Sequence, residues 1–185
     1  MKFVEKSWKV DEIMELWDLY DENRAKLNKT HVIGIPISEG EYHIVVDIWT
    51  INSKGEILIT QRHQEKTFGL LWECTGGSVI CGESSKVGAL RELSEEVGIN
   101  ASNEQLLLIH TIRLKDRFVD TYITRQDVVL DDLELQAEEV VDAKFISFEE
   151  LNIMWKNGLI VPRHRYELYQ DDIINYIKKN IDSKL

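Results

Sequence analysis

The stretch from Gly77 to Ile99, GSVICGESSKVGALRELSEEVGI, restricts the fold more than any other part of the chain. Glycines and serines precede a segment whose apolar residues recur at helical spacing, and a glycine follows it. This order predicts a loop that leads into a helix. Ser84 or Ser85 is expected to cap the amino end of the helix, and Gly98 to end it in the left-handed conformation.

The predicted helix has one apolar face and one acidic face. On a helical wheel two sets of residues separate onto opposite sides: Val87, Leu90, Leu93 and Val97 on one, and Glu92, Glu95 and Glu96 on the other. Like charges one turn apart weaken a helix by roughly 0.2–0.5 kcal/mol per pair. The three glutamates therefore destabilise the helix unless a positive charge lies among them. Gly88, inside the helix, predicts close packing against a sheet.

Strand and helix patterns alternate along the rest of the chain. Strands are predicted at 44–51, 56–61, 105–114, 118–130 and 140–146. Further helices are predicted after Ser147, where Glu150 completes a capping box, and from about Arg165 to Ile181. The pattern of residues 11–20 fits a short helix or an edge strand. We therefore expect an α/β domain in which a mixed sheet lies between helices. Residues 1–31 are interpreted as an N-terminal extension, and 32–185 as one domain with a C-terminal helix.

Composition limits the classes of function. The chain has 185 residues and a formal net charge of −11, so general binding to nucleic acid through a basic surface is not expected. Two cysteines, Cys74 and Cys81, lack the spacing of a zinc or redox motif and are expected to be free thiols. The first residues carry charges throughout, and no apolar run reaches the ~18 residues of a membrane span. We expect a cytoplasmic location and no membrane contact.

The crowded glutamates have two interpretations. An acid-rich helix is most simply a solvated surface. A metal site is favoured by the preceding glycine pair, Gly76 and Gly77, which lets backbone carbonyls approach an ion, and by Arg91, which can pair with Glu83. Carboxylates at i, i+3 and i+4 can share one or two divalent ions. Hard oxygen ligands select Mg²⁺, or Mn²⁺ as an alternative, and a phosphate group is the usual partner of such an ion.

The spacing of these residues resembles the signature of the Nudix hydrolases, G-x5-E-x7-R-E-U-x-E-E-x-G-U, where U is aliphatic. Every position is matched by Gly77, Glu83, Arg91, Glu92, Leu93, Glu95, Glu96, Gly98 and Ile99. The wider resemblance covers about residues 42–151. The segment WDLYDEN, residues 17–23, is similar to a Nudix subgroup related to isopentenyl diphosphate isomerase. The resemblance implies the Nudix-type α/β/α sandwich with its loop-helix-loop.

The resemblance also implies roles for individual residues. Glu92 and Glu96 would be the principal Mg²⁺ ligands, Glu95 a further ligand, and the carbonyl of Gly77 or of its neighbour Gly76 would complete the coordination. Glu83 and Arg91 would form a supporting salt bridge. Many members use one more glutamate from a distant loop as ligand or general base. Glu139, before the strand at 140–146, is the first candidate, and Glu138 is the second.

The implied reaction is Mg²⁺-dependent hydrolysis of the pyrophosphate bond in a nucleoside diphosphate linked to another moiety. A carboxylate, Glu139 or Glu92, would take a proton from the attacking water. Arg62, after the strand at 56–61, is a candidate contact for a substrate phosphate, although surface arginines are common. The aromatic side chains of Trp49, Phe68 and Trp72 could stack on a base, or could simply belong to the core.

Two alternatives belong to other classes. An isomerase similar to isopentenyl diphosphate isomerase would need an N-x-x-C-x-H-P-like loop, and the corresponding ECTGGSVICGES has no His-Pro and offset cysteines. A nucleotide-sensing module without catalysis would be expected to lack motif carboxylates or to carry a DNA-binding fusion, and neither is seen here. The identity of the nucleoside diphosphate derivative stays open. A homodimer is a candidate assembly because residues 1–31 contain apolar side chains that need burial.

Overall fold

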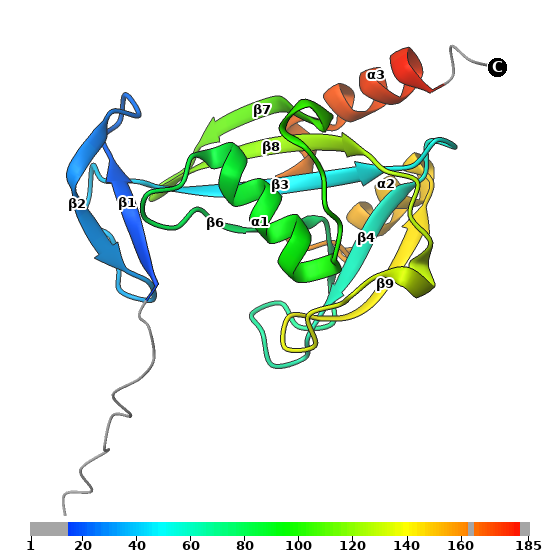
Figure 1. Cartoon of the computed structure of the whole chain (residues 1–185), viewed down its shortest axis with the longest axis horizontal. Helices are drawn as coiled ribbons and strands as arrows, with labels where there is room; N and C mark the ends of the chain where they lie inside the picture. The colour runs from blue at the N-terminus through cyan, green and yellow to red at the C-terminus, as the bar shows by residue number, and fades with distance from the viewer. Residues whose placement is uncertain (1–14, 163–164, 182–185) are drawn as a thin grey trace, which may run out of the picture.

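A computed structural model of the protein describes residues 15–162 and 165–181 (Figure 1). Its main sheet has seven strands in the order β5-β4-β3-β8-β7, with β6 added to β3 and β9 added to β4. The strands are β3 (His43–Ile51), β4 (Ile57–Arg62), β5 (Trp72–Glu73), β6 (Thr75–Ser78), β7 (Leu106–Arg113), β8 (Arg117–Arg125) and β9 (Val140–Ile146).

Strand β3 organises the sheet because it is paired along both of its edges. It runs parallel to β8 over its whole length, from the pair His43–Arg117 to the pair Ile51–Arg125. Its other edge pairs antiparallel with β6 near the start and with β4 only at Ile51. The sheet is therefore mixed, as the sequence predicted, and β6 lies directly beside the central strand.

Helices cover both faces of the sheet. α1 (Ser85–Val97) lies on one face, where its Leu93 and Val97 pack against the even-numbered residues of β3. α2 (Phe148–Lys156), the 3-10 turn η4 (Tyr166–Leu168) and α3 (Gln170–Asn180) lie on the other face, where Trp49 and Ile51 are fully buried. This confirms the predicted α/β/α sandwich. The short turns η1 (Asn103–Gln105) and η2 (Leu130–Asp132) connect other elements.

Several local predictions are confirmed and two need correction. Ser84 caps α1 by accepting a hydrogen bond from the backbone N–H of Val87 at 3.3 Å, and Gly98 follows with φ of 71°. The strand predicted at 118–130 ends at Arg125. The helix predicted from Arg165 is interrupted, because Arg165 has a left-handed φ of 48° and α3 begins only at Gln170.

Two predictions about α1 packing were also wrong in part. Val87 was assigned to the apolar face, but its side chain is 48% exposed. Gly88 does sit in a tight place, but its neighbours are Val79 and Glu83 in the loop before the helix rather than the sheet: a Cβ atom would lie 3.0 Å from Val79 Cγ2. The amino end of α1 therefore packs on its own preceding loop.

The N-terminal region forms a separate two-stranded antiparallel sheet, here called the hairpin, from β1 (Leu16–Tyr20) and β2 (Lys26–Val32). Figure 1 shows it standing across the end of the main sheet where β3 begins. The strand alternative for residues 11–20 is thus confirmed for 16–20, and residues 11–14 lie outside the described part. The boundary between 31 and 32 stays a prediction. A homodimer was a candidate because apolar side chains of residues 1–31 need burial. Three of them, Trp17, Leu19 and Tyr20, are at least half-buried within their own chain.

Candidate active site

Two carboxylates of α1 face the glycine pair of β6. The pairing of β6 with β3 places Gly76 opposite Asp47 and Gly77 opposite Val46. The backbone N–H of Gly76 donates to Glu96 Oε2 at 3.2 Å, and a Cβ atom at Gly77 would overlap the carboxylate of Glu92. The absence of a Cβ atom at position 77 therefore lets the carboxylate of Glu92 lie this close to the strand backbone.

Arg91 is the positive charge that the acidic cluster required. Its guanidinium donates to both carboxylate oxygens of Glu83, at 2.9 and 3.2 Å, which is the pairing expected from the sequence. It also donates to Glu92 at 3.0 Å, to Glu95 at 2.8 Å and to the carbonyl of Ser78 at 2.9 Å. One fork-shaped side chain thus joins the loop, the strand β6 and the helix.

The three helix glutamates lie in different environments. Glu96 is 7% exposed, whereas the side chain of Glu95 is 52% exposed. Burial, with the nearby charges of Glu73 and Glu92, raises the pKa of Glu96 to about 8. Burial also raises the pKa of Glu92, against the lowering effect of Arg91. The wheel therefore misplaced Glu96, which it assigned to the polar face and which is buried under the Gly76 backbone.

Glu139 lies in the same cavity as the helix acids, although it is distant in sequence. The cavity has a volume of about 360 Å³ and is lined in part by Gly77, Glu92, Glu96 and Glu139. Glu139 forms an ion pair with Lys66, from the loop after β4. The second candidate, Glu138, is exposed and does not line this cavity. The structure therefore brings Glu139, and not Glu138, to the helix acids.

Arg62 lines the same cavity but is already engaged with protein groups. It is 4% exposed, forms an ion pair with Glu73, and donates from Nε to the carbonyl of Thr67 at 2.9 Å. These contacts hold the loop after β4 in place. A contact between Arg62 and a substrate phosphate stays a prediction.

Two residues of the site were missed by sequence reasoning. Glu73, 6% exposed, contributes to the raised pKa of Glu96, and Lys66 pairs with Glu139. The signal for Lys66 was weak, because one lysine in a polar loop is ordinary. Glu73 had a usable signal: it is a charged residue within a short strand pattern, three positions before Gly76, where burial requires a partner.

The chemistry of the cavity fits a divalent cation. Its lining holds five carboxylates, those of Glu15, Glu92, Glu95, Glu96 and Glu139, against only three basic side chains, those of Arg62, Lys66 and Arg91. Such a surface repels a pyrophosphate unless a cation lies between them. Within the described residues no three side chains of His, Cys, Asp or Glu already converge as a ligand set. The fit rests on hard oxygen donors and on the raised pKa of Glu96.

Other predicted features are settled by their positions. Cys74 and Cys81 are free thiols, and Cys74 is buried in the core on the α2–α3 side, away from the helix acids. Trp49 is fully buried, so it belongs to the core, whereas Phe68 is 43% exposed. Lys144 lies over the ring of Trp72, 4.1 Å from its centre. In the part of the chain that the structure describes, no helix combines the length and apolarity that crossing a membrane requires.

Comparison with known proteins identifies relatives of this chain. A family model described as "NUDIX domain" matches residues 41–168. An uncharacterized Nudix hydrolase of Listeria monocytogenes is 37% identical over 151 residues, which cover 80% of this chain and 89% of that protein.

Solved structures share the fold. A protein of Deinococcus radiodurans superimposes with a TM-score of 0.67 at 20% identity, covering 80% of this chain and 92% of that one. The NUDIX domain of NrtR from Shewanella oneidensis, crystallised with ADP ribose, has a TM-score of 0.50 at 19% identity, covering 60% of this chain and 75% of that one.

Proposed function

The chain belongs to the Nudix hydrolase family, whose members hydrolyse pyrophosphate bonds, and from this premise we propose that it cleaves a nucleoside diphosphate linked to another moiety, with Mg²⁺ as cofactor. The observation that carries the proposal is the burial of Glu92 and Glu96 against the backbone of Gly76 and Gly77. The complex of the Shewanella oneidensis domain with ADP ribose supports a substrate of this class. Mn²⁺ is the alternative ion.

The residues have separate roles in the proposed reaction. Glu92 and Glu96, with Glu95 and the carbonyl of Gly77, would hold the cation, which when bound neutralises phosphate charge and lowers the pKa of coordinated water. Arg91 orients Glu92 and Glu95 and is itself fixed by Glu83.

Glu139 is the proposed general base. It lines the same cavity as the helix acids, and Lys66 forms an ion pair with its carboxylate. In this position it would accept a proton from the water that attacks phosphorus in line with the leaving phosphate. Glu92 is the second candidate for this role, because it lies on the same cavity and its pKa is raised by burial.

The test is a hydrolysis screen against nucleoside diphosphate derivatives, with Mg²⁺, with Mn²⁺ and with chelator, in which chromatography detects release of the two phosphomonoester products. The panel should include ADP-ribose, dinucleoside polyphosphates, nucleotide sugars, coenzyme A and NADH. We expect metal-dependent release that disappears in Glu96→Gln. Isomerisation of isopentenyl diphosphate instead would support the isomerase alternative, and nucleotide binding without release would support the sensor. A cytoplasmic location and a homodimer remain predictions, to be checked by fractionation and by mass in solution.

A further inference from the structure

The hairpin is bonded directly to the loop that precedes α1. The backbone carbonyl of Leu16 in β1 accepts a hydrogen bond from the N–H of Cys81 at 2.7 Å. The carboxylate of Asp18 accepts from the N–H of Gly82 at 2.8 Å and from Cys81 Sγ at 3.4 Å. Asp18 is only 6% exposed, and Lys26 of β2 completes its partners at 2.7 Å. A buried carboxylate with these donors holds the loop backbone firmly.

The bonded part of the loop leads straight to Arg91. Glu83 follows Gly82, and its carboxylate accepts from the N–H of Ile80 at 3.2 Å as well as from Arg91. Arg91 in turn donates to Glu92 and Glu95. A chain of contacts therefore runs from Asp18 through the loop and Arg91 to the helix acids.

A second attachment, to β8, holds the hairpin beside the loop that Asp18 contacts. Arg24, in the turn between β1 and β2, donates to Asp120 of β8 with both terminal nitrogens. Asp120 is 1% exposed and also accepts from the hydroxyl of Ser85, the first residue of α1. Trp17 of β1 also stacks on His43 of β3, with ring centres 3.8 Å apart.

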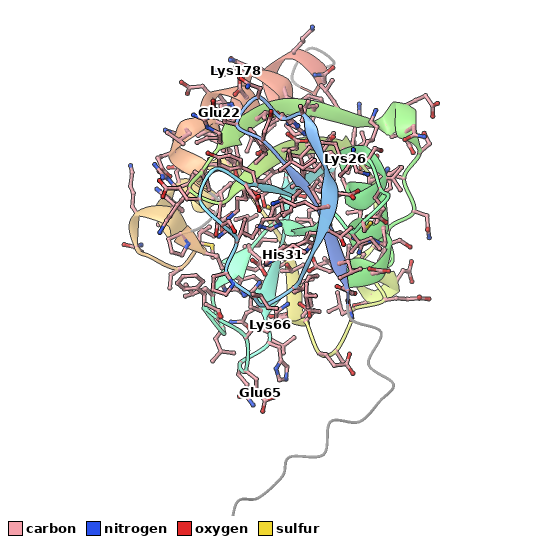
Figure 2. The ribbon with its side chains drawn as sticks, turned by 90° about the vertical axis from the view of Figure 1, so that its left-hand side faces the viewer. Glu22, Lys26, His31, Glu65, Lys66 and Lys178 are labelled. Atoms are coloured by element: carbon pink, nitrogen blue, oxygen red, sulfur yellow. The ribbon has the colours of Figure 1, made fainter. Side chains whose placement is uncertain are left out.

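Figure 2 views the molecule from this end. The hairpin lies across the front, with Lys26 and His31 on β2, and Lys66 lies below it in the loop after β4. Asp18 is absent from the lining of the cavity, so direct contact with a ligand bound there is not expected. Its effect on the site has to pass through the loop.

We propose that the hairpin is part of the active-site scaffold, with Asp18 as a positioning residue that fixes the loop at Cys81 and Gly82 and thereby sets Glu83 and Arg91 against the metal-binding glutamates. The proposal rests on the metal role proposed above for Glu92 and Glu96. The carboxylate oxygen that accepts from Gly82 is the group that matters, and the charge that Asp18 shares with Lys26 is secondary.

Three variants separate these contributions. Asp18→Ala removes the acceptor and the charge. Asp18→Asn keeps an oxygen that can accept from Gly82 but loses the ion pair. Lys26→Met removes the ion pair and leaves Asp18 in place. Denaturant unfolding of each variant shows whether a change is only a loss of stability.

The readouts are Mn²⁺ affinity, measured by electron paramagnetic resonance without substrate, and the NMR signal of the Arg91 Nε–H together with amide exchange at Cys81 and Gly82. In Asp18→Ala we expect Mn²⁺ affinity to fall by roughly tenfold or more. The Arg91 signal should shift, and the two amides should exchange faster. Asp18→Asn and Lys26→Met should remain within about threefold of the wild type.

The proposal is overturned if folded Asp18→Ala keeps the wild-type Mn²⁺ affinity and Arg91 signal, or if Lys26→Met loses as much affinity as Asp18→Ala. If Asp18→Ala does not fold, Asp18→Ser, whose hydroxyl is too short to reach Gly82, is measured in the same way. If the wild type binds no Mn²⁺, the proposed metal role fails, and the Arg91 signal and amide exchange still decide whether Asp18 positions the loop.

Discussion

At the scale of single residues, Glu96 links burial most clearly to the proposed cation. Its carboxyl group is buried beside Glu73 and Glu92, and its pKa rises to about 8. In metal-free protein near pH 7 this group is therefore largely protonated. A divalent ion would replace that proton, because metal ligands must be deprotonated to bind. The side chain of Glu95 is largely exposed, so solvent can stabilise its negative charge without a bound ion.

This contrast gives the first prediction. Glu96→Gln should lower kcat/KM by more than about 100-fold, because it removes a proposed ligand that is buried, whereas Glu95→Gln should lower it by about tenfold or less. Both are measured on the substrate that the screen identifies, at saturating Mg²⁺. Equal losses in the two variants would show that burial does not rank the ligands.

His43 provides a pH-dependent prediction. Burial, with the positive charge of Arg117, lowers the pKa of His43 from 6.5 to about 4. Between these values the unfolded chain binds more protons than the folded one, so the free energy of unfolding falls as pH drops from 6.5 to 4. The shift corresponds to a loss on the order of 3 kcal/mol.

His43→Phe keeps an aromatic ring against Trp17 and cannot be protonated. Urea unfolding of the variant should therefore depend less on pH over this range than that of the wild type. Identical pH profiles would mean that the histidine does not titrate with a lowered pKa.

At the scale of elements, glycines determine where helices end. Gly98 after α1 and Gly158 after α2 have nearly equal φ values, 71° and 69°. They differ in their surroundings, because a Cβ atom at Gly98 would lie 2.9 Å from Glu134 Cβ and one at Gly158 would meet nothing within 4 Å.

The pair forms a matched experiment. Gly158→Ala should lower the free energy of unfolding by about 1–2 kcal/mol, the cost of a left-handed alanine. Gly98→Ala should lower it further, because Glu134 must also move. Denaturant unfolding measures both free energies. Equal losses would show that the segment around Glu134 can move away from the new methyl group without a loss of stability.

The elements themselves were largely predictable from sequence, and their limits followed from local signals. Ser147 and Glu150 form the expected capping box at α2, and Gly55, with φ of 82°, lies in the turn between the two strands predicted at 44–51 and 56–61. Capping and turn signals depend on a few neighbouring residues, so they can be recognised from the sequence. The break before α3 was missed because residues 165–169 contain no glycine or proline, although Arg165 adopts a left-handed conformation.

At the scale of the whole molecule, the motif could be identified from the sequence, but the contacts that hold its loop and helix in place could not. The pairing of Glu83 with Arg91 follows from spacing, whereas Asp18 contacts Gly82 across 64 positions and Arg24 contacts Asp120 across 96. The burial of Glu96 is likewise a tertiary effect, since it depends on where β6 lies. A single sequence carries no local signal for contacts of this kind.

The last prediction concerns the stability of the whole protein. Because an ion that binds only the folded chain stabilises it by mass action, Mg²⁺ at about 100 times its dissociation constant should add about 2.7 kcal/mol. The thermal midpoint should rise accordingly, as measured by differential scanning calorimetry, and Glu96→Gln should lose most of that rise. An unchanged wild-type midpoint at high Mg²⁺ would contradict the proposed ion site.

The contact between Arg24 and Asp120 has a consequence for how the protein is made. Arg24 of the hairpin is synthesised before its partner Asp120 in β8, which follows it by 96 residues. At typical synthesis rates the delay is roughly 5–20 s. During that interval the hairpin lacks its contact with Asp120, and Ser85 at the start of α1 lacks its partner in β8. A nascent chain stalled before residue 120 should therefore bind no metal tightly, although every proposed metal ligand on α1 has already been synthesised.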